Sequence, residues 1–334
     1  MGSGHWSTDV YGAARAYRAS TGASAFGYTD DVSAKAPRSS WKAHPSLDPK
    51  GVGVRESRDS DEHPLSQAVA VLFDVTGSMG HIPRGLQAKL PELFGLLLRK
   101  GYLAHPQIMF GGIGDATCDR APLQVGQFES DNRMDTQLGD ILLEGGGGGQ
   151  MMESYELAMY FMARHTAMDC LDKRGRRGYL FLMGDELAYP VVKAKEVRAV
   201  IGDDIHDDIP LAQIVAELKA KFEVFHIVPA GAYHAKDTRL EEFWRSLFGQ
   251  NVIMLEDLDA VSETIAVTIG LAEEAIDLAQ GLADLGDVGS SAGEAVSKAL
   301  APIARGRTVA VRGGLPADLG GGDDEAGPAR TRRL

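Results

Sequence analysis

The stretch Ala68–Gly80, with the sequence AVAVLFDVTGSMG, decides the fold. It begins with six small or apolar residues in a row and then meets Asp74. A continuous apolar run of this length that ends in polar and glycine residues is typical of a strand buried on both faces. A buried helix is disfavoured because the run contains β-branched Val69 and Val71 and because glycines follow it. We therefore expect a central strand whose carboxyl end is at Asp74.

Three oxygen-bearing side chains alternate directly after this strand. Asp74, Thr76 and Ser78 can turn a carboxylate and two hydroxyl oxygens toward one point. Such oxygens are hard ligands, which suit Mg²⁺ or Mn²⁺ better than zinc or copper. The same residue types also form ordinary turns through side chain–backbone hydrogen bonds. The pattern of residues 74–78 alone is compatible with both a metal site and an ordinary turn.

Apolar segments of strand length alternate with segments of helical periodicity along the rest of the chain. Further strands are expected at 107–112, 123–128, 179–183, 223–228 and 252–255, and helices at 83–100, from 131, from 154 to 165, at 210–221, at 238–248 and from 258 to about 282. Pro91 is expected to kink or split the first helix. The alternation predicts an α/β fold: a doubly wound, mostly parallel sheet with helices on both faces and one short antiparallel edge strand. Ligands of such sheets bind beyond the carboxyl ends of the strands, where strand order reverses.

A second apolar strand also ends in a carboxylate, because Gly184-Asp185-Glu186 follows residues 179–183. Five consecutive glycines, Gly145–Gly149, lie between the two acidic strand ends and precede Gln150. With these three segments in this order, residues 66–273 resemble the von Willebrand factor A (vWA) family. Asp74-Val75-Thr76-Gly77-Ser78 matches the D-x-[ST]-x-S opening of that family's metal-ion-dependent adhesion site (MIDAS).

The resemblance implies a set of metal ligands from three loops, and the implied ion is Mg²⁺ or Mn²⁺. The first loop would supply Asp74, Thr76 and Ser78, and the third loop would supply Asp185. Gln150 stands where the family's second loop has a threonine, and Glu153 is a close substitute for it. The family more often has Asp-Gly in the third loop, where this chain has Gly184-Asp185.

The resemblance also implies a function. A metal in such a site keeps an open position that accepts an acidic residue of a partner protein. We therefore expect a metal-dependent protein-binding module of the bacterial intracellular type, and not an enzyme. Bacterial relatives often act with MoxR-type AAA+ ATPases or in stress and conflict gene clusters, which makes such a component the expected partner. A metal-independent structural assembly component is an alternative.

Enzymatic alternatives rest on weaker patterns. Thr76-Gly77-Ser78-Met79-Gly80 approaches the G-x-S-x-G nucleophile elbow, which would make Ser78 the nucleophile of a serine hydrolase, but Thr76 replaces the first glycine. A triad would take Asp185 and either His226 or His234. The glycine run lacks the Lys-Ser/Thr of a phosphate-binding P-loop. His226 alternates with apolar residues on a strand, so a packed core histidine is the better interpretation.

Several acidic residues have a simpler interpretation as loop residues. Asp115 and Asp119 follow the strand at 107–112, where they would lie near the rim of the metal face. Residues 203–208 (DDIHDD) contain metal-ligand residue types, but they precede the helix at 210–221, so a solvated loop with a helix cap is expected.

The composition limits which of these interpretations are compatible with the whole chain. The chain has 334 residues, a net charge of −13 and 44% hydrophobic residues. An acidic chain lacks the basic face that nucleic-acid backbones require. We expect an irregular N-terminal arm at 1–61, a vWA-like domain at 62–282 and a flexible tail at 283–334. The distant Cys118 and Cys170 indicate neither a disulfide framework nor a zinc site, and with no visible signal peptide or membrane span we expect a cytoplasmic protein.

Overall fold

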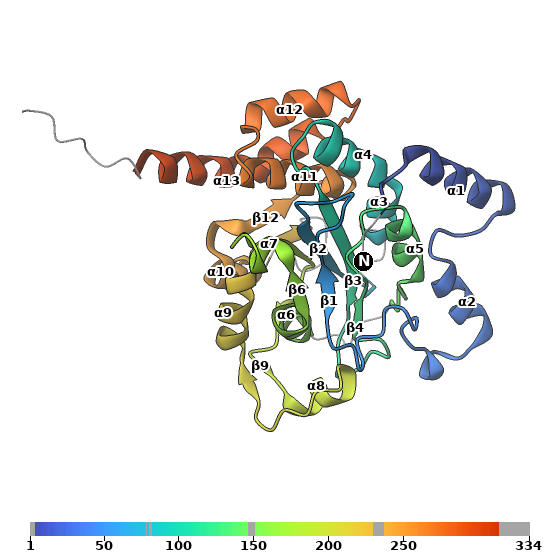
Figure 1. Cartoon of the computed structure of the whole chain (residues 1–334). Helices are drawn as coiled ribbons and strands as arrows, with labels where there is room; N and C mark the ends of the chain where they lie inside the picture. Colours follow the sequence, from blue (N-terminus) through green and yellow to red (C-terminus); the bar gives the residue numbers. More distant parts are fainter. Residues whose placement is uncertain (1–3, 78, 80–81, 146–150, 230–236, 314–334) are drawn as a thin grey trace, which may run out of the picture.

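The computed structural model describes residues 4–77, 79, 82–145, 151–229 and 237–313 (Figure 1). Its centre is a six-stranded sheet in the order β12-β11-β7-β2-β3-β4. Five of the strands are parallel, namely β2 (Gln67–Asp74), β3 (Pro106–Ile113), β7 (Gly178–Met183), β11 (Phe222–Pro229) and β12 (Val252–Leu255). β4 (Leu123–Val125) pairs antiparallel with β3 at one edge. The predicted fold class, including the short antiparallel edge strand, is confirmed.

Strand β2 contributes to two cores, one on each face of the sheet. Val69, Val71 and Phe73 pack into one core, and the alternate residues Ala68, Ala70 and Leu72 pack into the other. The unbroken apolar run therefore reflects burial on both faces of a parallel sheet.

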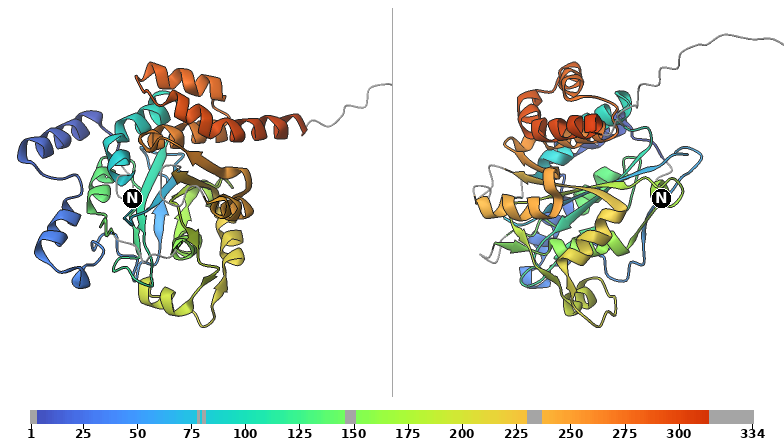
Figure 2. Two further views of the ribbon diagram at one scale, coloured as in Figure 1. Left: turned by 180° about the vertical axis from the view of Figure 1, so that it is seen from behind. Right: turned by 90° about the vertical axis from the view of Figure 1, so that its left-hand side faces the viewer.

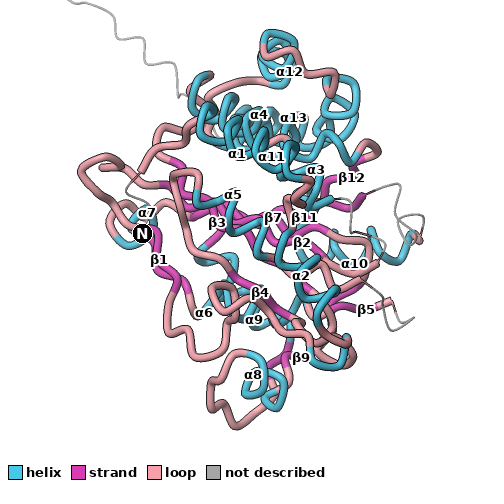
Figure 3. Tube along the Cα trace, turned by 90° about the vertical axis from the view of Figure 1, so that its right-hand side faces the viewer, coloured by secondary structure: helices cyan, strands magenta, loops and turns pink. Residues whose placement is uncertain are grey.

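Helices cover both faces, as Figures 1 and 2 show. The first core is closed by α3 (Ile82–Ala88), α4 (Leu90–Phe94), α5 (Arg133–Asp140), α11 (Val261–Ala272) and α13 (Gly293–Gly313). The second core is closed by α6 (Tyr155–Arg164), α9 (Leu211–Lys221) and α10 (Thr238–Phe248). Figure 3 shows the two helical layers on opposite sides of the strands.

Strand order reverses beside β2. The chain leaves β2 for β3 on one side and later returns to β7 on the other side, from which it continues outward to β11 and β12. The point between β2 and β7 is therefore the topological switch point, and a ligand crevice is expected at the carboxyl ends of these two strands.

Shorter elements complete the described chain. They are β1 (Arg55–Ser57), β5 (Met152–Glu153), β6 (Thr166–Met168), β8 (Leu187–Ala188), β9 (Val191–Val192), β10 (Ile209–Pro210), α7 (Asp169–Asp172), α8 (Ala194–Val200), α12 (Leu278–Asp287), a π-helical turn at Gly95–Arg99 and 3₁₀ turns at Arg38–Ser40, Gly249–Asn251 and Leu258–Ala260. The helix expected at 83–100 is divided at Lys89, shortly before Pro91. In the described parts of the chain, no helix is both long enough and apolar enough to cross a membrane.

The two ends of the chain differ from the prediction. The N-terminal arm, which was expected to be irregular, contains two helices, α1 (Thr8–Thr21) and α2 (Gly27–Lys35). Residues 293–313 form α13 instead of a flexible tail, and Val296, Leu300 and Ile303 are buried in the core. The i, i+4, i+7 spacing of these three apolar residues explains the helix, although small and charged residues dominate the segment.

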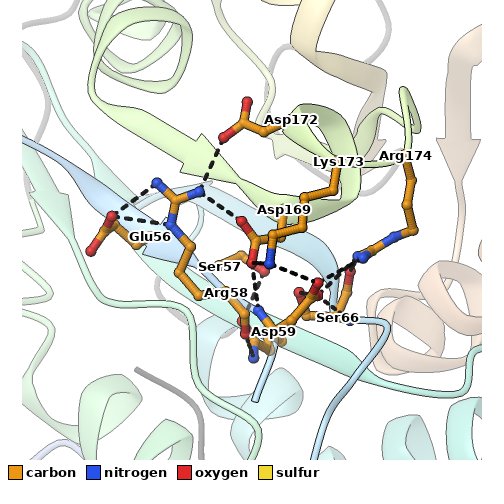
Figure 4. A network of polar contacts seen from close by, with 10 residues as sticks. Glu56, Ser57, Arg58, Asp59, Ser66, Asp169, Asp172, Lys173 and Arg174 are labelled. Carbon is orange, nitrogen blue, oxygen red and sulfur yellow. Dashed lines mark hydrogen bonds and ion pairs between the residues drawn. The ribbon is translucent and has the colours of Figure 1, made fainter.

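A network of ion pairs lies at the amino end of β2, as Figure 4 shows. Arg58 contacts Asp169 at 2.8 Å and Asp172 at 3.0 Å. Asp59 contacts Arg174 at 2.8 Å and Lys173 at 3.2 Å, and its carboxylate accepts hydrogen bonds from the backbone and the hydroxyl of Ser66. The network joins the segment after β1 to the start of β2 and to α7.

The Asp59→Asn substitution is expected to lower the free energy of unfolding by about 2 kcal/mol, because it removes the charged partner of these hydrogen bonds. Burial alone would raise the pKa of Asp59, but the hydrogen bonds from Arg174, Ser66 and Lys173 outweigh it and hold the pKa well below its usual value. This stabilisation is present above the unfolded-state pKa, near 4, and is lost as the pH falls toward the folded-state pKa. Chemical denaturation near neutral pH and in acid measures both effects. Equal stability of variant and wild type at neutral pH would contradict the assignment.

Candidate metal site

Two carboxylates meet at the switch point. Asp74 is the last residue of β2, and Asp185 lies two residues beyond β7. The strands are neighbours with Phe73 opposite Met183, so both acids lie at the same edge of the sheet. Both side chains are buried. The structure thus brings together the two aspartates that the sequence placed at strand ends.

Asp74 uses only one of its two carboxylate oxygens for the local turn. Its Oδ1 accepts a hydrogen bond of 2.6 Å from the backbone N–H of Thr76. Its Oδ2 is buried and has no hydrogen-bond partner among the described residues. The turn interpretation therefore accounts for Oδ1 of this carboxylate, and Oδ2 is available to a ligand. The side chain of Thr76 is also buried in this loop.

Two glutamates extend the acidic site. Strands β5 and β8 pair in parallel with Glu153 opposite Ala188, and Glu186 directly precedes β8. Both glutamates are buried, and the Oε2 atom of each has no hydrogen-bond partner within the described part of the chain. Glu153 was considered from the sequence as a substitute ligand, whereas Glu186 was not recognised.

Burial and mutual repulsion raise the pKa values of these acids. For Asp74, burial is the largest cause, the hydrogen bonds from Thr76 oppose it, and the negative charges of Asp185 and Asp119 add to it, which raises the pKa to about 7. The pKa values of Glu153 and Glu186 are also raised, first by burial and then by the charge of Asp74. Near neutral pH the site is thus a buried acidic cluster that favours uptake of positive charge, as protons or as a cation.

The Asp74→Asn substitution is expected to remove a pH-dependent loss in the free energy of unfolding of the metal-free protein. Between about pH 4 and about pH 7 the folded Asp74 holds a proton that the unfolded chain has released, so raising the pH through this window lowers the free energy of unfolding. His226 acts in the opposite direction, because burial lowers its pKa to about 3. The difference in melting temperature between variant and wild type isolates the contribution of Asp74 to this pH dependence. In EDTA, this difference should grow from about pH 5 to about pH 8; a constant difference would contradict a raised pKa.

The loop after β3 is held mainly by its own hydrogen bonds. The carboxylate of Asp115 accepts hydrogen bonds from the backbone of Thr117 at 2.8 Å and from the hydroxyl of Tyr189 at 3.1 Å, and Asp119 accepts one from the backbone of Asp115 at 2.8 Å. Asp115, which was expected to be a loop residue near the rim, is buried. Arg38 of the N-terminal arm lies 3.4 Å from Asp119 and so brings positive charge to this rim.

A packed aromatic cluster lies against the third loop, which contains Gly184 and Asp185. The ring of His226 is fully buried and stacks on Trp244 with a centroid distance of 3.7 Å, and the ring of Tyr155 meets Trp244 edge-on at 5.1 Å. A Cβ atom on Gly184 would lie 1.7 Å from the Tyr155 hydroxyl. Glycine is therefore required directly before Asp185, which explains the Gly-Asp order. The prediction of a packed core histidine at 226 agrees with this environment.

Several predicted residues lie outside the part of the chain that the structure describes, namely Ser78, Gln150 and His234. Within the described part, no group of three or more His, Cys, Asp or Glu side chains is arranged to hold a metal ion. The donor chemistry nevertheless fits Mg²⁺ or Mn²⁺, because buried carboxylate oxygens of Asp74, Glu153 and Glu186 have no described partner and hard cations prefer such oxygens. Asp74, Asp185 and Thr76 would hold the ion, which would supply positive charge and an open position for an anionic oxygen.

Comparisons with known proteins give partial structural similarity. No protein-family model matches the chain, and no curated protein matches its sequence. Among solved structures, the pilus adhesin SpaC from Lactobacillus rhamnosus GG has a TM-score of 0.43 at 9% identity over 65% of this chain and 31% of that chain. Proximal thread matrix protein 1 from the mussel byssus, with a zinc-occupied MIDAS motif, has a TM-score of 0.38 at 13% identity over 61% of this chain and 47% of that chain. The chain thus spans about a third to a half of the length of these proteins.

Proposed function

We propose that this chain is a metal-dependent protein-binding module that takes Mg²⁺ or Mn²⁺ at the carboxyl ends of β2 and β7. The observation that supports the proposal most is the buried Oδ2 of Asp74, which has no hydrogen-bond partner among the described residues and lies next to Asp185 at the switch point. An ionised carboxylate without a partner is costly to bury. A divalent cation offsets this cost and turns an unfavourable site into a binding site.

Binding is favoured over catalysis. His226 is the described histidine that a triad would use, but it is fully buried and burial lowers its pKa. A general base must reach both its acid partner and the nucleophile. The serine hydrolase alternative predicts specific labelling of Ser78 by a fluorophosphonate probe, and such labelling would overturn the proposal.

The proposed partner is a protein that presents an exposed aspartate or glutamate. Its carboxylate would occupy the open position on the ion, as in the vWA family that the sequence resembles. The same resemblance suggests MoxR-type AAA+ ATPases and other components of stress or conflict systems in the bacterial cytoplasm as the first candidates. A metal is needed for this contact, because an acidic site without a cation repels an acidic partner.

A pull-down against such candidates, in Mg²⁺ and in EDTA, tests the function. Wild type should retain a partner in Mg²⁺ and lose it in EDTA, and Asp185→Asn should fail in both. Asp59→Asn is the matched control, because it neutralises an aspartate at the opposite end of β2 and should bind as wild type does. Retention of the partner by wild type in EDTA would instead support a metal-independent structural component.

A further inference from the structure

The segment 141–145 leads from α5 to the first residue of the glycine run and lies beside the acidic site, although it belongs to no helix or strand. The backbone N–H of Gly145 donates a hydrogen bond of 3.3 Å to the carbonyl oxygen of Val75, which directly follows Asp74. The beginning of the segment is buried. Buried backbone outside regular secondary structure must find other partners for its N–H and C=O groups. These partners show what holds the segment against the first loop.

The sheet and the loop after β3 hold one side of this segment. The backbone N–H of Leu142 donates a hydrogen bond of 2.8 Å to the side-chain oxygen of Gln124 in β4, and the side-chain amide of Gln124 donates one of 2.9 Å to the carbonyl oxygen of Leu142. The buried carboxylate of Glu144 accepts hydrogen bonds of 2.8 Å and 3.0 Å from the backbone N–H groups of Arg120 and Ala121. The domain thus supplies partners for the second and fourth residues of the segment.

The N-terminal arm supplies partners for the first, third and fifth residues. The hydroxyl of Thr29 in α2 donates a hydrogen bond of 3.0 Å to the carbonyl oxygen of Ile141 and accepts one of 2.9 Å from the backbone N–H of Leu143. A methyl group in place of this hydroxyl would remove both hydrogen bonds. α2 packs beside α5, as Figure 1 shows, and a Cβ atom on Gly139 of α5 would lie 2.7 Å from the carbonyl oxygen of Ala25.

The guanidinium group of Arg38 joins the arm to two loops at once. Its Nη2 donates a hydrogen bond of 2.6 Å to the carbonyl oxygen of Gly145 and lies 3.4 Å from Oδ1 of Asp119. Its Nε lies 3.3 Å from Oε1 of Glu144. Both carboxylates are buried, whereas the side chain of Arg38 is half exposed. The planar guanidinium makes these contacts in fixed directions, which the single ammonium group of a lysine does not reproduce.

We propose that the N-terminal arm positions the acidic site, and that Thr29 and Arg38 are the positioning residues. They hold the segment 141–145 in place, and this segment holds the backbone of Val75 directly after Asp74. The role rests on the proposed function, because the affinity for the ion is its measurable consequence. Groups that orient metal ligands without touching the metal typically contribute about 10- to 100-fold to metal affinity. An arm that detaches from the domain would therefore weaken the binding of the ion.

Calorimetric titration of Mg²⁺ into two variants of unchanged net charge tests this role. Thr29→Val and Arg38→Lys should each weaken Mg²⁺ binding about tenfold, and the double variant should weaken it further. Because neither variant changes the charge, altered long-range electrostatics cannot cause the loss. The matched control is Ser33→Ala, which removes an exposed hydroxyl of α2 that donates to the carbonyl oxygen of Asp30; it should bind as wild type does. If wild type binds Mg²⁺ and the double variant binds it equally well, the positioning role is wrong and the proposed function stands.

Hydrogen exchange of the metal-free protein tests the same role without the ion. In EDTA, peptides that cover 141–145 and 74–77 should exchange faster in both variants, because the segment no longer holds the backbone after β2. A peptide from β12, at the opposite edge of the sheet from β4, should exchange as in wild type, which excludes general unfolding. Unchanged exchange at 74–77 would overturn the proposal, because the arm would then hold only its own neighbours. Failure of wild type to bind Mg²⁺ would instead refute the proposed function, and hydrogen exchange would still decide what the arm holds.

Discussion

Asp74→Asn should weaken Mg²⁺ binding by at least about 100-fold and stabilise the metal-free protein by about 1–3 kcal/mol. The first effect follows because the variant keeps the shape of the side chain but removes the anionic oxygen that the first loop offers. Thr76 contributes only a neutral oxygen, which does not displace the hydration shell of Mg²⁺ by itself. The second effect follows because the charge of Asp74 is buried beside Asp185 and has one oxygen without a described partner. Calorimetric titration measures binding, and thermal unfolding in EDTA measures stability.

The matched control separates these effects from a general loss of structure. Asp59→Asn is also an Asp-to-Asn change near a terminus of β2, but it removes an engaged carboxylate. It should destabilise the protein and leave Mg²⁺ affinity unchanged. A less stable Asp74→Asn variant in EDTA would show that the carboxylate is an ordinary turn-forming residue. Wild-type affinity in that variant would remove Asp74 from the ligand set.

Gly184→Ala should be among the most destabilising single-methyl additions in the chain, with a loss of about 3 kcal/mol or more. The new Cβ would lie 1.7 Å from the Tyr155 hydroxyl and 3.1 Å from Cβ of Asp74. Tyr155 cannot move aside easily, because its ring is fully buried against Trp244 and His226. The third loop would have to shift, so Mg²⁺ affinity should fall together with stability.

Two companion variants make this prediction specific. Gly184→Ala combined with Tyr155→Phe should recover part of the lost stability, because the atom nearest to the new methyl group is absent. Gly286→Ala in α12 adds a methyl group where nothing lies within 4 Å, so it should be neutral or stabilise by up to about 1 kcal/mol. Denaturant unfolding gives all three values. A loss below 1 kcal/mol for Gly184→Ala would contradict the close packing under the third loop.

The sequence predicted the central sheet well because buried parallel strands carry a local signal. β12 (Val252–Leu255) and α10 (Thr238–Phe248) have the predicted bounds, and β2 and β7 differ from theirs by one residue. Each of these segments is either continuously apolar or strongly periodic, and burial on both faces forces that composition.

The ends of the chain were predicted less well because the formation of their helices depends on contacts with residues that are distant in the sequence. Tyr11 in α1 donates a hydrogen bond of 2.8 Å to the carbonyl of Gln87, which belongs to α3. In α13, Leu300 and Ile303 are buried among residues of other elements. Small and polar residues around these anchors give a composition typical of loops, although a few apolar contacts suffice to order each helix.

The candidate site could be predicted only in part. Asp74 and Asp185 follow from one rule, since both end buried strands that flank the switch point. Glu153 was considered only through the family resemblance and Glu186 was missed, because the approach of both depends on the two-residue pairing of β5 with β8. Strands of two residues have no periodicity that a sequence can reveal.

A crystal structure of the wild-type protein soaked in Mn²⁺ tests the central claim most directly. Mn²⁺ replaces Mg²⁺ at oxygen sites and gives an anomalous signal stronger than that of the protein's sulfur atoms. The account predicts one strong anomalous peak at the carboxyl ends of β2 and β7, within coordination distance of Asp74 and bound to Asp185 directly or through water. A map without a peak there, in which Asp74 Oδ2 is bonded to a protein group, would contradict the account.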